Sequence, residues 1–199
     1  MLLSELTNAD KIFQANGLDT EIKGLTADSR TVKPGYLFAA IQGSNWDGRK
    51  FITDAITRGA AAILAPCDTV LPPEVENIPL IKAKNPRQSL SLIANQYFKS
   101  QPRINVAVTG TNGKTSVAWF TQTIWKLLGH NSAAIGTLGT IPKTQNSRYT
   151  NGLTTPDPVT LHRELNSLTQ RDIDRVVLEA SSHGLEQYRL DGVNLSAGA

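Results

Sequence analysis

A glycine-rich segment, Thr109-Gly110-Thr111-Asn112-Gly113-Lys114-Thr115-Ser116, lies between a predicted strand and a predicted helix. Glycines allow backbone N–H groups to turn towards phosphate oxygens, and the start of a helix adds partial positive charge. In such a loop the lysine neutralises the β- and γ-phosphates, and the hydroxyl of the next residue can hold Mg²⁺. The segment therefore predicts a binding site for the phosphates of a nucleotide.

This segment departs from the common phosphate-loop pattern at one position. That pattern places a glycine where this chain has Val108. The alternative interpretation is an ordinary glycine-rich connection with Lys114 in solvent. The strand and helix on either side of the segment favour the phosphate site.

Glu179 is the second residue whose position predicts chemistry. It follows the apolar run Val176–Leu178 and is expected at the carboxyl end of a strand, beside the phosphate loop. Burial of a carboxylate without a cation is costly, and carboxylate oxygens are ligands that Mg²⁺ accepts. We therefore predict Lys114 and Glu179 as catalytic residues, and Thr115 and Glu179 as metal ligands.

The residues around this loop alternate between strand and helix patterns. Apolar runs predict strands over 104–108, 133–136 and 175–178. Asp157 and Pro158 are expected to start a helix, whose apolar residues are Leu161, Leu165 and Leu168. The helix after the loop is expected to bury Val117, Phe120, Thr121, Ile124 and Leu128. This order is the βαβαβ beginning of a doubly wound nucleotide-binding domain.

The first hundred residues also alternate, which indicates a separate α/β domain. Strands are predicted over 36–41 and 61–65, with helices over 47–60 and from Pro86 onwards. The second of these helices carries an apolar stripe of Leu90, Ile93, Ala94, Tyr97 and Phe98. Because Ser100, Gln101 and Pro102 interrupt the pattern, we predict domains over 1–102 and 103–199.

Composition excludes several classes of protein. Of 199 residues, 40% are hydrophobic and 19% charged, which argues against general disorder. The net charge of +3 and the 6% of aromatic residues argue against a nucleic-acid module. The amino-terminal residues do not resemble a signal peptide, and no apolar run approaches the ~20 residues that cross a membrane. We therefore expect a cytoplasmic protein without membrane insertion, and Cys67 as a small core residue.

Three sets of motifs resemble the Mur ligase family. The run T-G-T-N-G-K-T at 109–115 is similar to the ATP site of Mur ligases and of folylpolyglutamate synthetases. Residues 26–30, 34–38 and 47–51 resemble the amino-terminal signature of the E and F types of Mur ligase, which the folate enzymes lack. Residues 154–156 and 179–185, T-T-P and E-A-S-S-H-G-L, resemble motifs of the E type.

The resemblance implies a fold and a reaction. The fold is a small amino-terminal α/β UDP-binding domain followed by an incomplete P-loop-type, doubly wound parallel-sheet ATPase domain. The reaction uses ATP and Mg²⁺ to add a diamino acid, L-lysine or meso-diaminopimelate, to UDP-N-acetylmuramoyl-L-alanyl-D-glutamate through an acyl phosphate, in peptidoglycan synthesis. The alternatives are a non-catalytic module that binds the same precursor, and part of an F-type ligase.

The resemblance also implies substrate-binding residues. Those that match positions for the UDP group are Ala27, Ser29, Ser44, Asn45 and Trp46. Those that match positions for the muramoyl dipeptide are Thr154, Thr155, Ser181, Gln187 and Arg189. Arg189 is the strongest of these on physical grounds, because a guanidinium can bind a carboxylate or pyrophosphate with two hydrogen bonds.

Family members continue beyond the residues that match Asp191–Val193. Residues 194–199 lack the bulky apolar strand expected there, so they are not expected to continue the family pattern. The resemblance thus implies a partial ATP-binding domain, no carboxyl-terminal domain and no turnover by residues 1–199 alone. It also implies an exposed sheet edge through which chains can associate.

Overall fold

A computed structural model describes residues 1–7, 12–14, 19–43, 46–75, 77–142 and 153–199. The chain forms two compact units, Met1–Tyr97 and Phe98–Ala199. The predicted boundary near residue 102 lies in the connection between helix α3 (Pro86–Phe98) and strand β6 (Ile104–Val108).

The first unit is built on a five-stranded sheet of order β1-β5-β4-β3-β2. Strands β2, β3, β4 and β5 run parallel to one another, and β1 is antiparallel to β5. The strands span Ile12–Gln14 (β1), Gly24–Thr26 (β2), Tyr36–Ala39 (β3), Ala60–Pro66 (β4) and Leu80–Ala83 (β5). The helices of this unit are α1 (Leu3–Thr7), α2 (Ile52–Thr57) and α3, with the 3-10 turns η1 (Ser29–Thr31), η2 (Gly48–Phe51) and η3 (Pro73–Val75).

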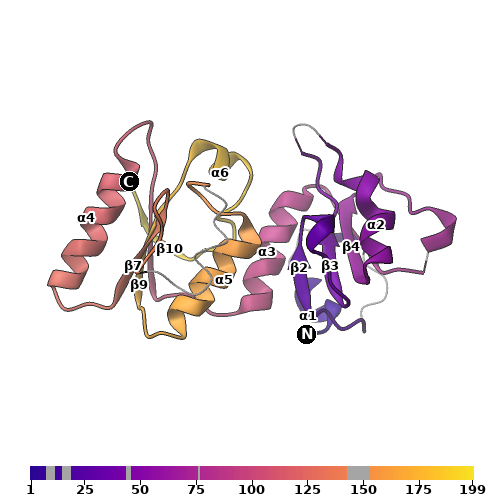
Figure 1. The fold of residues 1–199 in the computed structure, drawn as a ribbon, viewed down its shortest axis with the longest axis horizontal. Coiled ribbons are helices and arrows are strands. Elements are labelled where there is room, and N and C mark those ends of the chain that lie inside the picture. The colour runs from indigo at the N-terminus through magenta and orange to yellow at the C-terminus, as the bar shows by residue number, and fades with distance from the viewer. Residues whose placement is uncertain (8–11, 15–18, 44–45, 76, 143–152) are drawn as a thin grey trace. The chain divides into compact units, whose positions relative to one another are not determined.

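Both faces of this sheet are covered, which explains why its strands are apolar throughout. Ile52 and Ala55 of α2 pack against one face, together with Phe38 and Ile63. Leu64 is also fully buried, although it follows Ile63 and points to the opposite face. Figure 1 draws α2 on one side of the sheet and α3 on the other.

The second unit has a five-stranded sheet of order β10-β6-β9-β7-β8. Strands β10, β6, β9 and β7 are parallel, and β8 is antiparallel to β7. The remaining strands span Ser132–Gly136 (β7), Gly139–Ile141 (β8), Arg175–Glu179 (β9) and Leu195–Gly198 (β10). The helices are α4 (Lys114–Leu127), α5 (Pro158–Thr169) and α6 (Ser182–Glu186).

Helices α4 and α5 cover opposite faces of this sheet. In β9, Val176 and Leu178 pack with the leucines of α5, whereas Val177, between them, packs with Ala118 of α4. Asp157 caps α5 by accepting hydrogen bonds from the backbone of the first turn, as predicted. The predicted α/β class with a doubly wound parallel sheet is confirmed.

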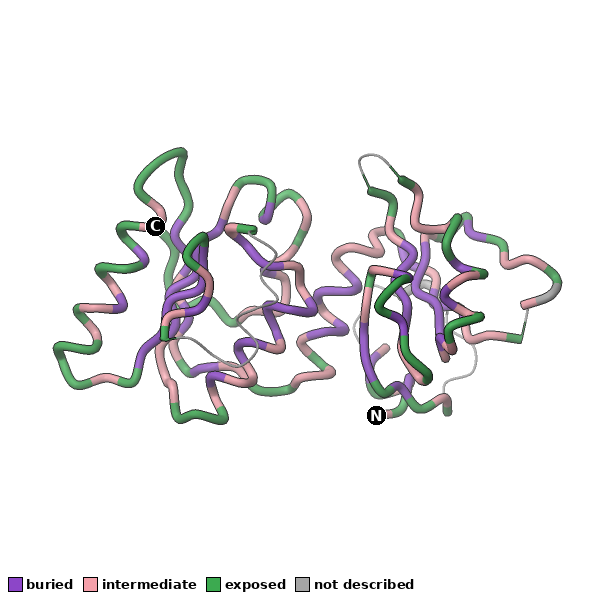
Figure 2. The backbone as a smooth tube through the Cα atoms, in the orientation of Figure 1, coloured by how far each residue is buried: buried purple, intermediate pink, exposed green. Residues whose placement is uncertain are grey.

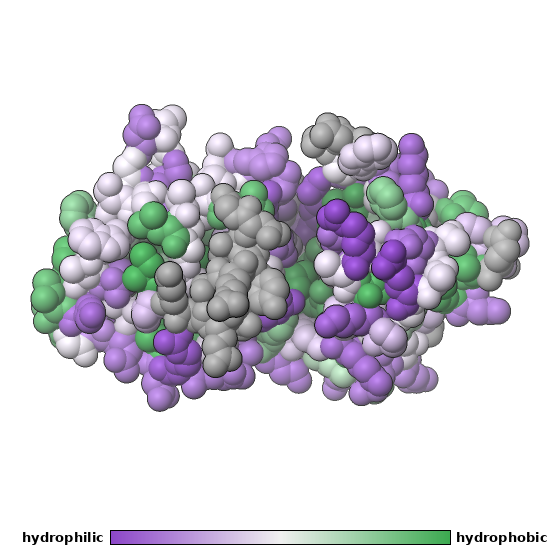
Figure 3. Space-filling model, viewed as in Figure 1, coloured by the Kyte–Doolittle hydropathy of each residue, from purple (hydrophilic) through white to green (hydrophobic). Residues whose placement is uncertain are grey.

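The prediction for the buried face of α4 is wrong. Four of the five residues expected inside, Val117, Phe120, Ile124 and Leu128, are exposed, and Thr121 is half-buried. Ala118 and Gln122 are the buried residues of α4 instead, and the small side chain of Ala118 packs against Val177 of β9. Gln122 also exchanges two hydrogen bonds with Ser132 at the start of β7. Green and pink segments therefore dominate α4 in Figure 2, and Figure 3 shows hydrophobic side chains on its surface.

Two smaller features complete the fold. Cys67 is exposed, so the expectation of a core cysteine is wrong. It follows β4, where the chain leaves the covered part of the sheet. Among the described residues, no helix has the length and apolar character needed to span a membrane.

Candidate functional site

The glycine-rich loop connects the carboxyl end of β6 to the first turn of α4. Gly110 has φ 133° and Gly113, the N-cap of α4, has φ 83°. Side chains other than glycine rarely adopt these values. A Cβ at Gly113 would have no heavy atom within 4 Å, so the space before the helix is open. The loop is thus an exposed turn at the positive end of a helix, as an anion site requires.

Lys114 lies across this loop rather than in bulk solvent. Its Nζ donates hydrogen bonds to the carbonyl oxygens of Gly110 and Thr111. These contacts hold the ammonium group over the turn, within the region where phosphate oxygens would bind. The arrangement is compatible with the predicted role of Lys114.

Thr115 and Glu179 are in direct contact. Oγ1 of Thr115 donates a hydrogen bond of 2.9 Å to Oε2 of Glu179. The contact forms because Val108 and Glu179 are register partners in neighbouring parallel strands, so β6 and β9 end at the same level. Glu179 is only 3% exposed.

Two further hydrogen-bond donors to Glu179 come from Thr137, just after β7. The backbone N–H of Thr137 donates to Oε1 of Glu179 at 3.0 Å, and its Oγ1 donates to Oε2 at 3.1 Å. With Thr115, three donors surround this carboxylate. The buried charge is therefore compensated by hydrogen bonds without a cationic side chain.

The hydroxyl of Thr115 and the carboxylate of Glu179 fit Mg²⁺ by their chemistry, because this ion binds hard oxygen ligands. No group of three or more His, Cys, Asp or Glu residues in the described parts of the chain could hold a metal by itself. A protein that supplies one or two oxygens while phosphates and water supply the rest is typical of Mg²⁺–nucleotide sites.

Thr155 and Ser181, predicted to bind substrate, are engaged with the protein. Thr155 is 2% exposed and donates to the carbonyl oxygen of Glu179 at 2.8 Å. Since its proton is used there, the 3.1 Å contact with Ser181 must be donated by Ser181. Oγ of Ser181 also caps α6 by accepting from the N–H of Gly184. These two side chains fix the turn that follows Glu179.

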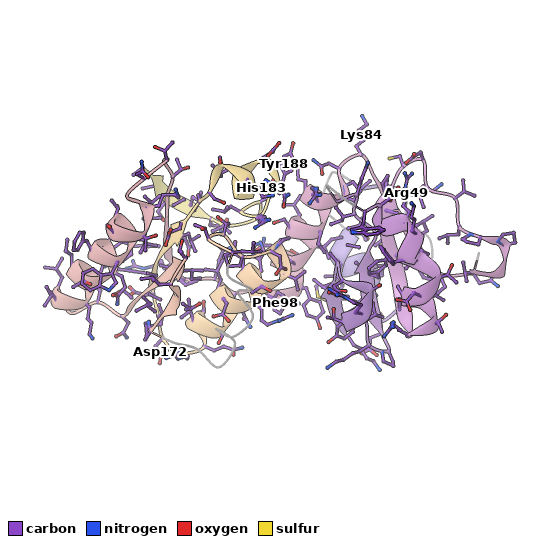
Figure 4. The ribbon with its side chains drawn as sticks, turned by 45° about the horizontal axis from the view of Figure 1, so that its top comes forward. Arg49, Lys84, Phe98, Asp172, His183 and Tyr188 are labelled. Carbon is purple, nitrogen blue, oxygen red and sulfur yellow. The ribbon has the colours of Figure 1, made fainter. Side chains whose placement is uncertain are left out.

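Gln187 and Arg189 point the same way, as their spacing predicts. Nε and Nη2 of Arg189 donate to Oε1 of Gln187 at 3.1 and 2.7 Å. Nη1 of Arg189 donates to the carbonyl oxygen of Thr155 at 2.6 Å. Nε2 of Gln187 lies 2.8 Å from Nε2 of His183, on α6. Figure 4 shows His183 and Tyr188 in this same segment.

Residues predicted to meet the UDP group lie in the first unit. Ala27 is exposed, whereas Ser29 is 8% exposed and hydrogen-bonds Asp54. Trp46 is 69% exposed. Ser44 and Asn45 lie outside the described residues. The structure places Ala27 and Ser29 around the η1 turn that follows β2.

Ion pairs stiffen the turns on either side of these residues. Asp28 caps η1 and binds Arg30 through both carboxylate oxygens, which lowers the pKa of Asp28. Asp47 caps η2 and binds Arg49, which also reaches Asp68 at 3.0 Å. Both motifs place an aspartate two residues before the arginine, so each carboxylate serves the backbone and the guanidinium together.

Sequence reasoning missed Gly136 and Thr137. Nothing in their local pattern marks them, because their partner Glu179 lies far along the chain. These residues could have been found from the topology. Strand β7 is parallel to β9 and ends beside it, so the residues that follow β7 lie close to Glu179.

Comparison with known proteins gives two family matches. Residues 108–199 match the Mur ligase middle domain, and residues 21–98 match the Mur ligase family, catalytic domain. The first match runs to residue 199, so the expectation that residues 194–199 leave the family pattern is wrong. The prediction required a bulky apolar strand, whereas β10 consists of Leu195 followed by three small residues, all of them exposed.

Curated relatives match over the whole chain. UDP-N-acetylmuramoyl-L-alanyl-D-glutamate–2,6-diaminopimelate ligases from Brucella melitensis and Bradyrhizobium diazoefficiens are 47% and 46% identical over 199 residues. These alignments cover 100% of this chain and 40% of each relative. The chain thus spans about two fifths of the length of the relatives it matches.

Solved structures give the same fold. A structure of a UDP-N-acetylmuramoyl-L-alanyl-D-glutamate–2,6-diaminopimelate ligase matches with a TM-score of 0.77 at 28% identity, covering 100% of this chain and 39% of that one. MurF ligase from Thermotoga maritima, solved in complex with ADP, matches with a TM-score of 0.52 at 20% identity, covering 88% of this chain and 36% of that one. The second match supports the fold alone.

Proposed function

The chain belongs to the Mur ligase family, and from this premise we propose that it carries the precursor-binding and ATP-binding regions of a ligase that adds 2,6-diaminopimelate to UDP-N-acetylmuramoyl-L-alanyl-D-glutamate. The choice of diamino acid is supported by the names of the curated relatives at 46–47% identity. In this proposal residues 1–102 bind the UDP precursor, and residues 103–199 bind ATP.

The proposed reaction joins a carboxylate to an amine. The terminal phosphoryl group of ATP passes to a carboxylate oxygen of the precursor, which gives an acyl phosphate and ADP. The amino group of the diamino acid then attacks the acyl carbon and the C–N bond forms, while the C–O bond between the acyl carbon and phosphate breaks and phosphate leaves with its electron pair. A proton from the amine is released.

The single observation that carries the proposal is the contact between Thr115 and Glu179 at the carboxyl ends of β6 and β9. It places a hydroxyl and a carboxylate beside a helix N-terminus, with Lys114 over the loop between them. Bound Mg²⁺ would neutralise charge on the phosphate oxygens and so favour phosphoryl transfer. Thr115 and Glu179 would hold this ion, while Lys114 would bind the β- and γ-phosphates.

The backbone of the loop supplies the remaining phosphate contacts in this proposal. Its residues are Gly110, Thr111, Asn112, Gly113 and Ser116, all of them exposed. N–H groups in the first turn of a helix lack partners within the helix, so they are available to phosphate oxygens.

Precursor binding is divided between the two units in the proposal. Ala27, Ser29, Ser44, Asn45 and Trp46 would meet the UDP group. Thr154, Gln187 and Arg189 would meet the muramoyl dipeptide. The hydroxyl groups of Thr155 and Ser181 donate hydrogen bonds within the protein, so their role would be to position the backbone around Glu179.

We also propose that chains associate through the edge of the second sheet. All four residues of β10 are exposed, and β10 is the edge strand of this sheet among the described residues. An exposed parallel edge strand offers unpaired backbone groups to another chain.

Isothermal titration calorimetry on the 199-residue chain tests the main proposal. ATP with Mg²⁺ is expected to bind with one-to-one stoichiometry, and the UDP-muramoyl dipeptide is expected to bind independently. ADP should compete with ATP, whereas AMP should compete weakly because it lacks the β-phosphate. Absence of ATP binding at millimolar concentration would refute the proposal.

A further inference from the structure

Glu179 occupies space that exists only because residue 136 is glycine. A Cβ built on Gly136 would lie 2.0 Å from Oε1 and 2.4 Å from Cδ of Glu179. Atoms cannot approach this closely, so any larger residue at 136 must displace the carboxylate. Glu179 is the last residue of β9, and the residue before it, Leu178, is only 2% exposed, so the backbone that carries the carboxylate is fixed in the core. The position of the carboxylate therefore depends on the end of β7.

Thr137, the next residue, holds both oxygens of this carboxylate. Its N–H donates to Oε1 at 3.0 Å and its hydroxyl to Oε2 at 3.1 Å. Two donors from one residue, one on each oxygen, fix the rotation of the carboxylate as well as its place. Hydrogen bonds to a charged acceptor are stronger than those between neutral groups, so this pair is a strong constraint.

Thr115 uses the carboxylate that Thr137 has oriented. Oε2 accepts from both hydroxyls, at 2.9 Å from Thr115 and 3.1 Å from Thr137. Thr115 must donate its only proton to Glu179, so its lone pairs point away from the carboxylate. A hydroxyl in that orientation can coordinate a cation. The orientation of Thr115 thus depends on Glu179, and through it on Thr137.

Thr137 also contacts a residue on the other side of the site. Its Oγ1 lies 3.1 Å from Oγ1 of Thr154, and Thr137 itself is exposed. Its side chain is therefore accessible, and its loss would leave no cavity in the core. This separates an effect on the site from an effect on folding.

We propose that Thr137 is a positioning residue that orients Glu179 and Thr115 for a divalent cation bound with the nucleotide. Gly136 leaves the space in which the carboxylate of Glu179 reaches Thr137. The inference rests on the proposed function, because it needs a nucleotide and a cation at the loop. It goes beyond that function by assigning a residue outside the phosphate loop to the control of the cation.

The test compares ATP affinity in excess Mg²⁺ with ATP affinity in EDTA, by calorimetry on the 199-residue chain. The ratio of the two affinities measures what the cation contributes. Thr137→Val keeps the shape and the N–H but loses the hydroxyl, and is expected to reduce this ratio about tenfold, the scale of a hydrogen bond to a charged group. Affinity in EDTA should stay within twofold of the unmodified chain.

Three further variants separate positioning from general damage. Thr137→Ser restores the hydroxyl and should restore the ratio. Gly136→Ala should reduce the ratio as Thr137→Val does, because it displaces the same carboxylate. Thr169→Val, which removes a hydroxyl bonded to Leu165 within α5, is the matched control and should leave the ratio unchanged.

The outcomes are distinct. A ratio in Thr137→Val equal to that of the unmodified chain overturns the inference and leaves the proposed function intact. A reduced ratio that Thr137→Ser fails to restore also overturns it, since the hydroxyl would then not be the cause. If the unmodified chain binds no ATP, the proposed function fails and the inference fails with it. If Thr137→Val does not fold, the affinity ratios of Gly136→Ala and Thr137→Ser are compared instead.

Discussion

Val108 and Glu179 are register partners at the carboxyl ends of β6 and β9. One strand continues into the phosphate loop and the other ends in the carboxylate, so both groups leave the sheet at the same level. Parallel pairing is what creates this meeting, because an antiparallel neighbour would place Glu179 at the opposite edge. The sheet thus builds a site from two segments that are far apart in sequence.

Replacing Glu179 with glutamine should weaken the binding of ATP in the presence of Mg²⁺. The variant Glu179→Gln keeps the shape but removes the charge that attracts the cation. We expect a loss of about 1.5–3 kcal/mol in Mg²⁺ and little change in EDTA, because hydrogen bonds to charged groups have this magnitude. Glu186→Gln on exposed α6 is the control. Equal losses with and without Mg²⁺ would contradict a cation-linked role.

Replacing Lys114 with alanine should weaken ATP binding whether or not Mg²⁺ is present. Nζ of Lys114 lies over the loop carbonyls, where it can exchange these contacts for phosphate oxygens. The expected loss is about 1.5–3 kcal/mol, measured by calorimetry with ATP. Lys126→Ala, in the last turn of α4, removes the same charge away from the loop and should bind ATP as before. Unchanged affinity in Lys114→Ala would place this lysine outside the phosphate site.

Local patterns predicted the parts of the site that depend on short segments. The glycines at 110 and 113 and the strand before them form one continuous stretch, so the loop could be recognised directly. The place of Glu179 followed from topology, since strands of a βαβ unit are parallel and end together. Asp157 at the start of α5 was also predictable, because a helix cap involves only the next few residues.

Contacts between distant segments could not be predicted in this way. Thr137 serves Glu179 through the pairing of β7 with β9, and Thr155 is tied to Ser181, but neither pair has a local signature. The prediction of the buried face of α4 was wrong for another reason. Helical periodicity identifies an apolar side, yet Ala118 shows that the size of a side chain can decide which side approaches the sheet.

Two substitutions on α4 should show which face supports the fold. Ala118→Leu adds volume where the helix meets the sheet, and overpacking of this kind costs about 1–3 kcal/mol in the free energy of unfolding. Leu127→Gln changes a residue that is 82% exposed, and should stay within about 0.5 kcal/mol of the unmodified chain. Urea denaturation measures both. A larger loss from Leu127→Gln than from Ala118→Leu would mean that the apolar side of α4 is covered in solution.

Association through β10 should be blocked by a proline in that strand. Ser196 has no register partner on β6. The variant Ser196→Pro therefore removes an N–H group that is not needed for the pairing of β10 with β6. Sedimentation velocity over increasing concentration is expected to show self-association of the unmodified chain and a monomer for the variant. Ser196→Ala, which changes the same residue but keeps the N–H, is the control. If the unmodified chain sediments as a monomer at every concentration, the proposal of association through β10 is wrong.

Acid should destabilise the second unit through His162. This side chain is 2% exposed, donates from Nε2 to the carbonyl oxygen of Asp191 at 3.0 Å, and burial lowers its pKa to about 4. In the unfolded chain the pKa returns to about 6.5, so the unfolded state binds more protons between these values. The contribution of neutral His162 is therefore complete above pH 6.5 and is lost as the pH falls towards 4. Over that range the free energy of unfolding should drop by about 3 kcal/mol.

Urea unfolding at steps between pH 7 and pH 4, followed by amide exchange in α5, measures this loss. His162→Gln has no group that titrates in the window and should show a much flatter profile. His183→Gln is the matched control, because His183 is exposed on α6 and its removal should leave the slope of the unmodified chain. The same slope in His162→Gln as in the unmodified chain would assign the acid sensitivity to another group. Asp28, whose pKa is lowered by its bond with Arg30, begins to lose its contribution only as the pH falls towards the unfolded value of about 3.9, so it affects the slope only at the acid end of this window.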